Sequence, residues 1–157
     1  MFDVVLYEPE IPPNTGNIIR LCANMGARLH LIEPLGFLLD DKRLRRAGLD
    51  YREFADVRVF ANYASFLAAR QPQPDRIFAC STKGAQSYAA SSFEAGDVFV
   101  FGPETRGLER NFLESLAPSR RICIPMQSGS RSLNLSNAVS IVLYEAWRQN
   151  DFQGSAG

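Results

Sequence analysis

The sequence predicts an α/β protein built on a mostly parallel sheet flanked by helices. Apolar runs of strand length alternate with segments whose apolar residues recur at helical spacing, which is typical of this class. Two of these runs lead into polar, glycine-containing loops, as strands do where an α/β sheet forms a ligand crevice. With 157 residues, 46% of them hydrophobic, the chain can bury one core. We expect a single domain over residues 1–152 and a disordered tail over residues 153–157.

The predicted strands follow from short apolar runs and cover residues 4–7, 29–32, 57–60, 76–80, 98–101 and 121–124. Helical spacing predicts helices over residues 15–25, 40–47, 61–70, 109–116 and 135–149. Asp40 and Asp41 suit the capped start of the second helix, and Asn134 and Ser136 suit the start of the last one. Residues 81–95 fit neither pattern, so we expect a loop there with about one turn of helix.

The last predicted helix carries apolar side chains around most of its circumference. They are Ala138, Val139, Ile141, Val142, Leu143, Tyr144, Ala146 and Trp147. A helix that covers its own sheet needs only one apolar stripe, so the remainder predicts another partner. A second copy of the chain is the simplest one, and we therefore expect a homodimer.

Composition excludes several classes of function. The 17 basic and 17 acidic residues give a formal charge of zero, so any contact with nucleic acid must come from local clusters, of which the densest is Lys42, Arg43, Arg45 and Arg46. Those four residues equally suit a solvated helix face. We expect no signal peptide and no membrane span, because the apolar stretches are short or interrupted by polar residues. The spacing of the three cysteines predicts reduced core thiols in a cytoplasmic protein rather than metal ligands.

Several catalytic motifs are absent from the sequence. No glycine-rich dinucleotide or triphosphate motif and no G-x-S-x-G elbow occurs. His30 is the only histidine and lies in a predicted strand, which favours a packed or edge position and argues against a Ser-His-Asp hydrolase. We expect no metal centre. What remains is loop backbone, small polar side chains, arginines and one glutamate, a set suited to transferring an already activated group.

Three segments carry a family resemblance: residues 13–20 (PNTGNIIR), residues 102–108 (GPETRGL) and residues 126–132 (MQSGSRS) with the helix start that follows. In this order they resemble the three motifs of the SPOUT superfamily of RNA methyltransferases, over essentially the whole chain. The resemblance implies a deep trefoil knot near the C-terminus and S-adenosylmethionine as methyl donor. It is strongest to the small bacterial enzymes that methylate the ribose 2′-hydroxyl of the wobble nucleotide, position 34, cytidine or modified uridine, in leucine tRNAs.

The same resemblance implies the residues of the site. Carried over by position, the cofactor-binding residues are Cys80, Gly102, Gly107, Ile124, Met126, Ser132 and Leu133. Arg20 is the expected catalytic residue, with Asn17 three positions earlier on the same helix face. Arginine stays protonated above pH 12, so clamping the RNA phosphate and stabilising alkoxide charge suit Arg20 better than general base catalysis. A solvated residue on a helix face is the alternative for Arg20, and tight turns are the alternative for the two glycines.

The remaining candidates bind substrate or shape loops. Glu104 either holds a loop through backbone amides or contacts substrate, and Arg131 lies in the third motif. Asn134 and Ser136 shape the cofactor loop or simply open a helix, and Tyr144 lies at the dimer edge of the site or packs in the core. The implied partner is tRNA, with no DNA, because the acceptor is a ribose hydroxyl.

Two other functions remain open at this point. One is 2′-O-methylation of another tRNA position or of ribosomal RNA, because the matching loops mostly bind cofactor. The other is a non-catalytic RNA-binding dimer, from which an enzyme differs by its dependence on Arg20.

Overall fold

Parallel strands form the centre of the molecule. The computed structural model describes residues 1–40, 42 and 56–157, and every strand pairing within these residues is parallel. The strands are β1 (Asp3–Tyr7), β2 (Arg28–Ile32), β3 (Val57–Phe60), β4 (Ile77–Cys80), β5 (Gln86–Ser87), β6 (Val98–Phe101) and β7 (Arg121–Cys123). They lie in the order β3-β2-β1-β6-β4-β7-β5. The predicted fold class is confirmed, and six of the seven strands lie where apolar runs predict them.

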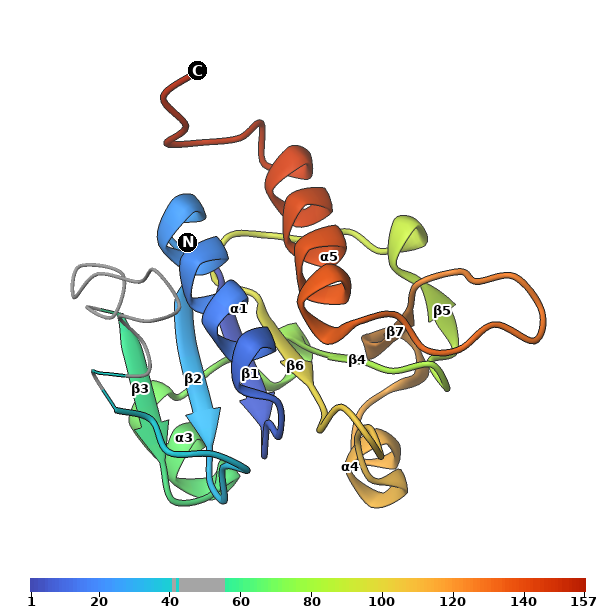
Figure 1. The fold of residues 1–157 in the computed structure, drawn as a ribbon. Coiled ribbons are helices and arrows are strands. Elements are labelled where there is room, and N and C mark those ends of the chain that lie inside the picture. The colour runs from blue at the N-terminus through green and yellow to red at the C-terminus, as the bar shows by residue number, and fades with distance from the viewer. Residues whose placement is uncertain (41, 43–55) are drawn as a thin grey trace.

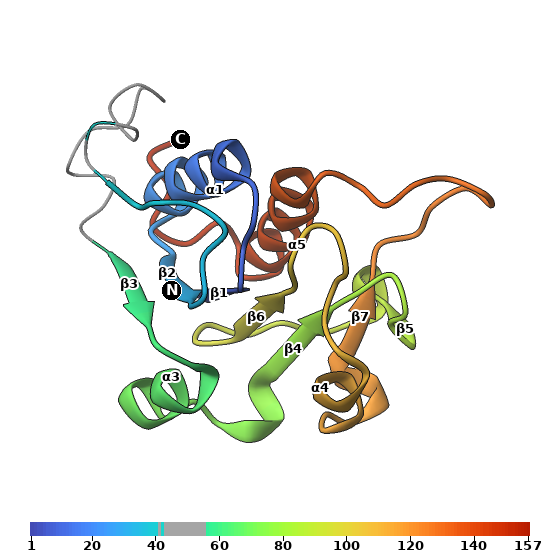
Figure 2. The same cartoon turned by 60° about the horizontal axis from the view of Figure 1, so that its bottom comes forward.

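Helices cover both faces of this sheet (Figure 2). Helices α1 (Pro12–Met25) and α5 (Leu135–Gln149) lie side by side on one face, while α3 (Tyr63–Arg70) and α4 (Arg110–Glu114) lie on the other. Single 3₁₀ turns occupy Pro74–Arg76, Tyr88–Ala90 and Pro118–Arg120. The predicted helix over residues 40–47 falls largely on residues 41 and 43–47, which lie outside the described part of the chain.

Side-chain alternation along the central strands produces two apolar layers. Val4 and Leu6 of β1 join the cluster under α1 and α5, whereas Val5 joins the cluster under α3 and α4. The buried residues Val139 and Val142 bring α5 onto the first cluster. Both faces of the sheet are therefore buried, which explains why its strands are apolar runs without polar alternation.

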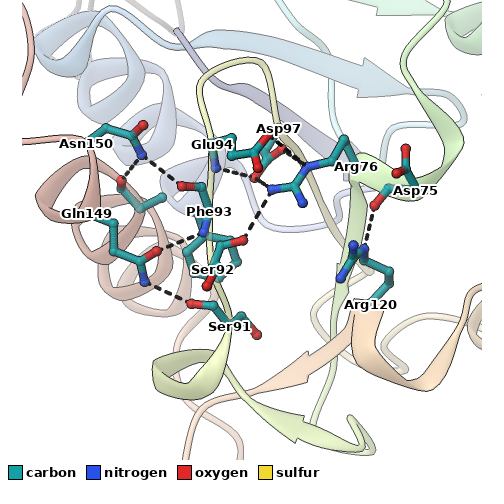
Figure 3. A network of polar contacts seen from close by, with 11 residues as sticks. Asp75, Arg76, Ser91, Ser92, Phe93, Glu94, Asp97, Arg120, Gln149 and Asn150 are labelled. Atoms are coloured by element: carbon teal, nitrogen blue, oxygen red, sulfur yellow. Dashed lines mark hydrogen bonds and ion pairs between the residues drawn. The ribbon is translucent and has the colours of Figure 1, made fainter.

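A polar network fixes the far end of α5 against the segment that precedes β6 (Figure 3). The side-chain amide of Gln149 accepts from the N–H of Phe93 at 2.8 Å and donates to the carbonyl of Ser91 at 3.0 Å. Beside it, Arg76 donates to both carboxylate oxygens of Asp97 at 2.7 and 2.6 Å. Because Asp97 is 1% exposed, this bidentate pair is screened little by solvent and holds β4 and β6 in place.

Other parts of the same chain cover some of the apolar surface of α5. Our assumption from the sequence that only the sheet covers this helix is wrong. Helix α1 contacts α5 directly, and the ring of Phe152 in the C-terminal segment lies 5.5 Å from that of Trp147. Tyr144 and Phe152 nevertheless remain 44% and 40% exposed. The pattern therefore overstates the surface left for a partner, although exposed aromatic side chains persist at this end of the helix.

Candidate functional site

A cavity of about 370 Å³ opens at the carboxyl ends of β4, β6 and β7. Four chain segments form its walls: the start of α1, the residues after β4, the loop after β6, and the segment from β7 into α5. Its volume lies in the range of about 300–1,000 Å³ that is usual for small-molecule sites. Ligands bind at this edge of open α/β sheets, and the cavity is therefore the candidate site.

All seven residues expected to bind cofactor line this cavity. They are Cys80, Gly102, Gly107, Ile124, Met126, Ser132 and Leu133. Their side chains are mostly apolar, and Met126 and Leu133 are more than a third exposed at the rim. The lining therefore combines apolar walls with loop backbone, as the sequence predicts.

The loop after β6 is held closed by its two glycines. Gly107 has a left-handed φ of 67°, and its N–H donates to the carbonyl of Pro103 at 2.8 Å. A Cβ on Gly102 would meet the backbone of Gly107 at 2.5 Å and overlap the nitrogen of Leu108. The absence of a side chain at Gly102 thus serves the loop's own folding, which is the tight-turn alternative for this glycine.

Glu104 ties this loop to the start of α1. Its carboxylate accepts from the backbone N–H groups of Glu10 at 2.9 Å and Ile11 at 2.6 Å. The side-chain amide of Asn14 also donates to Glu104, at 3.4 Å. Of the two roles left open for Glu104, its contacts are those of a residue that holds a loop through backbone amides.

Asn14 extends this connection to the segment between β7 and α5. The amide of Asn134 donates to the Oδ1 atom of Asn14 at 3.0 Å, so one chain of hydrogen bonds joins residues that lie 90 and 120 positions apart. Asn134 also accepts from the N–H of Ser136 at 2.9 Å, as a helix N-cap does. Asn134 therefore caps the start of α5 and also lines the cavity.

Asn14 is 5% exposed, and sequence reasoning missed it as a site residue. It lies in the quoted motif, but Pro12 and Pro13 were not recognised as the first turn of the helix. Proline is favoured there, because its missing N–H has no intrahelical partner in any case. Recognising this would have placed Asn14 inside the helix.

Two further hydrogen bonds strengthen the same junction. The carboxylate of Glu10 accepts from the N–H and the hydroxyl of Thr105 at 2.9 and 2.8 Å. These bonds lower the pKa of Glu10, with the backbone N–H contributing most. Arg106 pairs with Glu8 at 3.3 Å. The strand-end segment before α1 and the loop after β6 therefore hold each other by reciprocal contacts.

Cys80 has the properties of a lining residue and not of a nucleophile. Burial raises the pKa of its thiol to about 12, and the neighbouring Cys123 adds to this shift. A thiol with such a pKa stays protonated at neutral pH, and the thiolate is the reactive form. Cys22 of α1 behaves alike, because burial in the core raises the pKa of its thiol to about 12.

The expected catalytic pair lies beside the cavity and not in its wall. Asn17 and Arg20 are both exposed on α1, and neither is among the cavity-lining residues in the described part of the chain. Arg20 follows Asn14 by six residues, which corresponds to about 9 Å along the helix axis. Arg20 therefore lies on the exposed face of α1, outside the cavity.

The other candidates are dispersed. Arg131 and Ser136 adjoin cavity residues in sequence without lining the cavity, and Tyr144 stands two turns further along α5, against Trp147. Lys42 is exposed and distant from the cavity lining in sequence, while Arg43, Arg45 and Arg46 lie outside the described residues. No group of three residues able to hold a metal converges among the residues that the structure describes.

A cavity at the carboxyl edge of a parallel sheet is typical of an α/β protein that binds a small ligand. The chain belongs to the SpoU rRNA Methylase family, whose model matches residues 1–144.

Full-length relatives and solved structures agree with this membership. The chain is 60% identical over 156 residues to a tRNA (cytidine(34)-2′-O)-methyltransferase of Burkholderia pseudomallei (strain 1106a), covering 99% of this chain and 100% of the relative. It is also 60% identical over 155 residues to the enzyme of the same name from Escherichia coli (strain K12), covering 99% and 98%.

Among solved structures, one from work on the 2-OH methylation of C/U34 on tRNA has a TM-score of 0.86 at 45% identity, covering 96% of this chain and 97% of that one. The methyltransferase AviRb from Streptomyces viridochromogenes, in complex with AdoMet, has a TM-score of 0.78 at 26% identity, covering 95% and 57%.

Proposed function

We propose that this protein transfers a methyl group from S-adenosylmethionine to the ribose 2′-hydroxyl of the wobble nucleotide, position 34, of tRNA. The observation that carries this proposal is the cavity built by four sequence-distant segments, three of which are joined through Glu104, Asn14 and Asn134. Full-length relatives at about 60% identity that bear the name of this activity support the choice of nucleotide. Leucine tRNAs containing cytidine or modified uridine at that position are the proposed substrates.

The cavity fits the proposed methyl donor. Its apolar walls, which include Ile124 and Leu133, suit an adenine ring, while loop backbone and the hydroxyl of Ser132 offer polar partners. When bound, the donor supplies a methyl group on a positively charged sulfur that is already a leaving group. The protein then has to orient the reactants, which matches a site whose Cys80 thiol stays protonated at neutral pH.

Arg20 is the proposed catalytic residue, and its position on the exposed face of α1 suits contact with the RNA. Its guanidinium would hold the phosphate beside the acceptor ribose and stabilise negative charge on the 2′-oxygen. Asn17, one turn earlier on the same face, would assist in positioning that nucleotide. The hydroxyl proton leaves to solvent or to an RNA oxygen in this scheme, since a guanidinium does not accept it.

We also propose that the active form is a homodimer. The exposed Tyr144 and Phe152 provide aromatic surface at the end of α5, where Trp147 lies between them. Sedimentation velocity at micromolar concentration tests this directly: a dimer mass is expected. Replacement of Tyr144 by aspartate should shift the equilibrium toward monomer, because it introduces a charge into the proposed contact.

Two further proposals concern the chain's topology and location. A knotted C-terminus is supported by the insertion of β7, the last strand of the chain, between β4 and β5. We propose that the protein acts in the cytoplasm, where its three unpaired cysteines would remain reduced. No described helix is both long and apolar enough to cross a membrane.

Incubation with radiolabelled S-adenosylmethionine and bulk tRNA from a strain lacking the corresponding gene tests the activity. Nucleoside mapping should locate the label on the ribose of nucleotide 34. Label at another nucleotide would retain a methyltransferase but reject the proposed substrate. Absence of label, with the donor measurably bound, would reject the catalytic proposal in favour of a binding role.

A further inference from the structure

A second cavity adjoins the first, which we call the donor pocket, and lies between α4 and the start of β7. It has a volume of about 340 Å³ and is lined by Lys83, Leu108, Arg110, Leu113, Glu114 and Arg121. Lys83 and Leu108 line both cavities, so the two share a wall. The second cavity thus lies next to the site, but none of the functions described above uses it.

The lining of this second cavity is predominantly basic. It contains three cationic side chains and one carboxylate, in a chain whose formal net charge is zero. The cations come from three separate places: Lys83 follows β4, Arg110 begins α4 and Arg121 begins β7. The three cationic side chains therefore lie together only in the folded chain, because they are far apart in the sequence.

The arginines differ in how firmly they are held. Arg121 donates from two guanidinium nitrogens to the carbonyl of Leu116, at 2.9 and 2.7 Å, which fixes its orientation without neutralising its charge. Arg110 pairs with Glu114 at 2.8 Å, but these side chains are 87% and 53% exposed. An exposed pair of this kind contributes little, so Arg110 can exchange Glu114 for another anion.

We propose that Lys83, Arg110 and Arg121 form a subsite for the phosphate backbone of the RNA substrate, next to the donor pocket. This inference rests on the proposed function and deepens it by assigning residues to the substrate. Three cations spread around an open groove suit a repeating polyanion better than the single carboxylate of the methyl donor. No aromatic side chain is among the residues that line the groove, so it offers no platform on which a base could stack.

The test compares Lys83→Ala, Arg110→Ala and the double variant with the parent protein. Arg58→Ala is the matched control, because Arg58 is exposed on β3 at the opposite edge of the sheet. Arg121 is left in place, since its hydrogen bonds to Leu116 make it part of the local structure. Binding of a fluorescein-labelled leucine tRNA is measured by anisotropy across a potassium chloride series, and binding of S-adenosylmethionine is measured by calorimetry.

Each lost phosphate contact should lower the slope of log affinity against log salt by about 0.7–0.9. At 0.1 M salt this corresponds to roughly fivefold weaker tRNA binding for each single variant, with the double variant weaker still. The loss should be the same for a tRNA that is not a substrate, because contacts to phosphate do not read the bases. Donor affinity should stay unchanged in Arg110→Ala, because Arg110 lines the second cavity and not the donor pocket, and Arg58→Ala should bind tRNA as the parent does.

Parental affinity and salt slope in the double variant would overturn the subsite while leaving the proposed function intact. Weaker donor binding with unchanged tRNA binding would also overturn it, by assigning the groove to the donor. If the parent itself neither bound tRNA nor methylated nucleotide 34, the proposed function would fail, and the subsite with it.

Discussion

Replacing Glu104 by glutamine should loosen the junction between the loop after β6 and the start of α1. The shape of the side chain is kept, but an NH₂ group replaces one of the two oxygens that accept from the N–H groups of Glu10 and Ile11. A hydrogen bond to a charged acceptor contributes about 1.5–3 kcal/mol. Since the site is partly exposed, we take about 2 kcal/mol, which for a domain of this size lowers the melting temperature by about 4–8 °C.

Thermal unfolding followed by circular dichroism at neutral pH measures this fall, and calorimetry should show weaker binding of S-adenosylmethionine by the same variant. Glu109→Gln is the control: it removes the same charge five residues away, from an exposed side chain that makes no cap hydrogen bond to α4. The reasoning fails if Glu104→Gln and Glu109→Gln melt at the same temperature, because the loss would then reflect charge alone.

Three other changes test separate parts of the account. Arg20→Ala should abolish methyl transfer while donor affinity measured by calorimetry stays near that of the parent; transfer at the parental rate would remove Arg20 from catalysis. Gly102→Ala should lower both melting temperature and donor affinity, because its Cβ would overlap backbone of the same loop, and an unchanged melting temperature would contradict that overlap. Burial raises the pKa of Asp3, but hydrogen bonds from His30 and Arg28 outweigh it and leave the pKa below the usual 3.8. The stability that Asp3 contributes is therefore present above pH 3.8 and is lost as the pH falls through its lowered pKa in the folded state. In Asp3→Asn, the urea midpoint should therefore fall less steeply below about pH 4 than in the parent. An equally steep fall in both proteins would refute the pairing of Asp3 with His30 and Arg28.

The sheet and most helices could be predicted because burial on both faces leaves strong apolar runs. Helix α5 begins and ends at the residues predicted, since Asn134 supplies a recognisable cap. Strand β5 was missed: Gln86 and Ser87 are polar and join the sheet only through β7. A two-residue strand formed by tertiary pairing leaves no periodicity in the sequence.

The candidate site was predictable in its position but not in its internal contacts. The family motifs identified some of the cavity-lining residues, including Gly102 and Ser132, but not Asn14. They did not reveal that Glu10 and Thr105 bond to each other, because that contact depends on how two loops 95 residues apart meet. The groove around Lys83 was missed for the same reason, since its cations are scattered along the sequence and gather only in the folded chain.

The hydrogen bonds that close the donor pocket also explain why three short motifs far apart in the sequence act as one site. Glu104 reaches residues 90 or more positions away, and Asn134 reaches Asn14 across 120. Such contacts cannot form within any one loop, so the pocket requires the assembled order of β1, β6, β4 and β7. Local turn preferences at Gly102 and Gly107 shape one wall, but the meeting of the walls is a property of the whole sheet. Binding of a ligand that touches all of them must therefore stabilise the complete fold, because the unfolded chain offers no equivalent site.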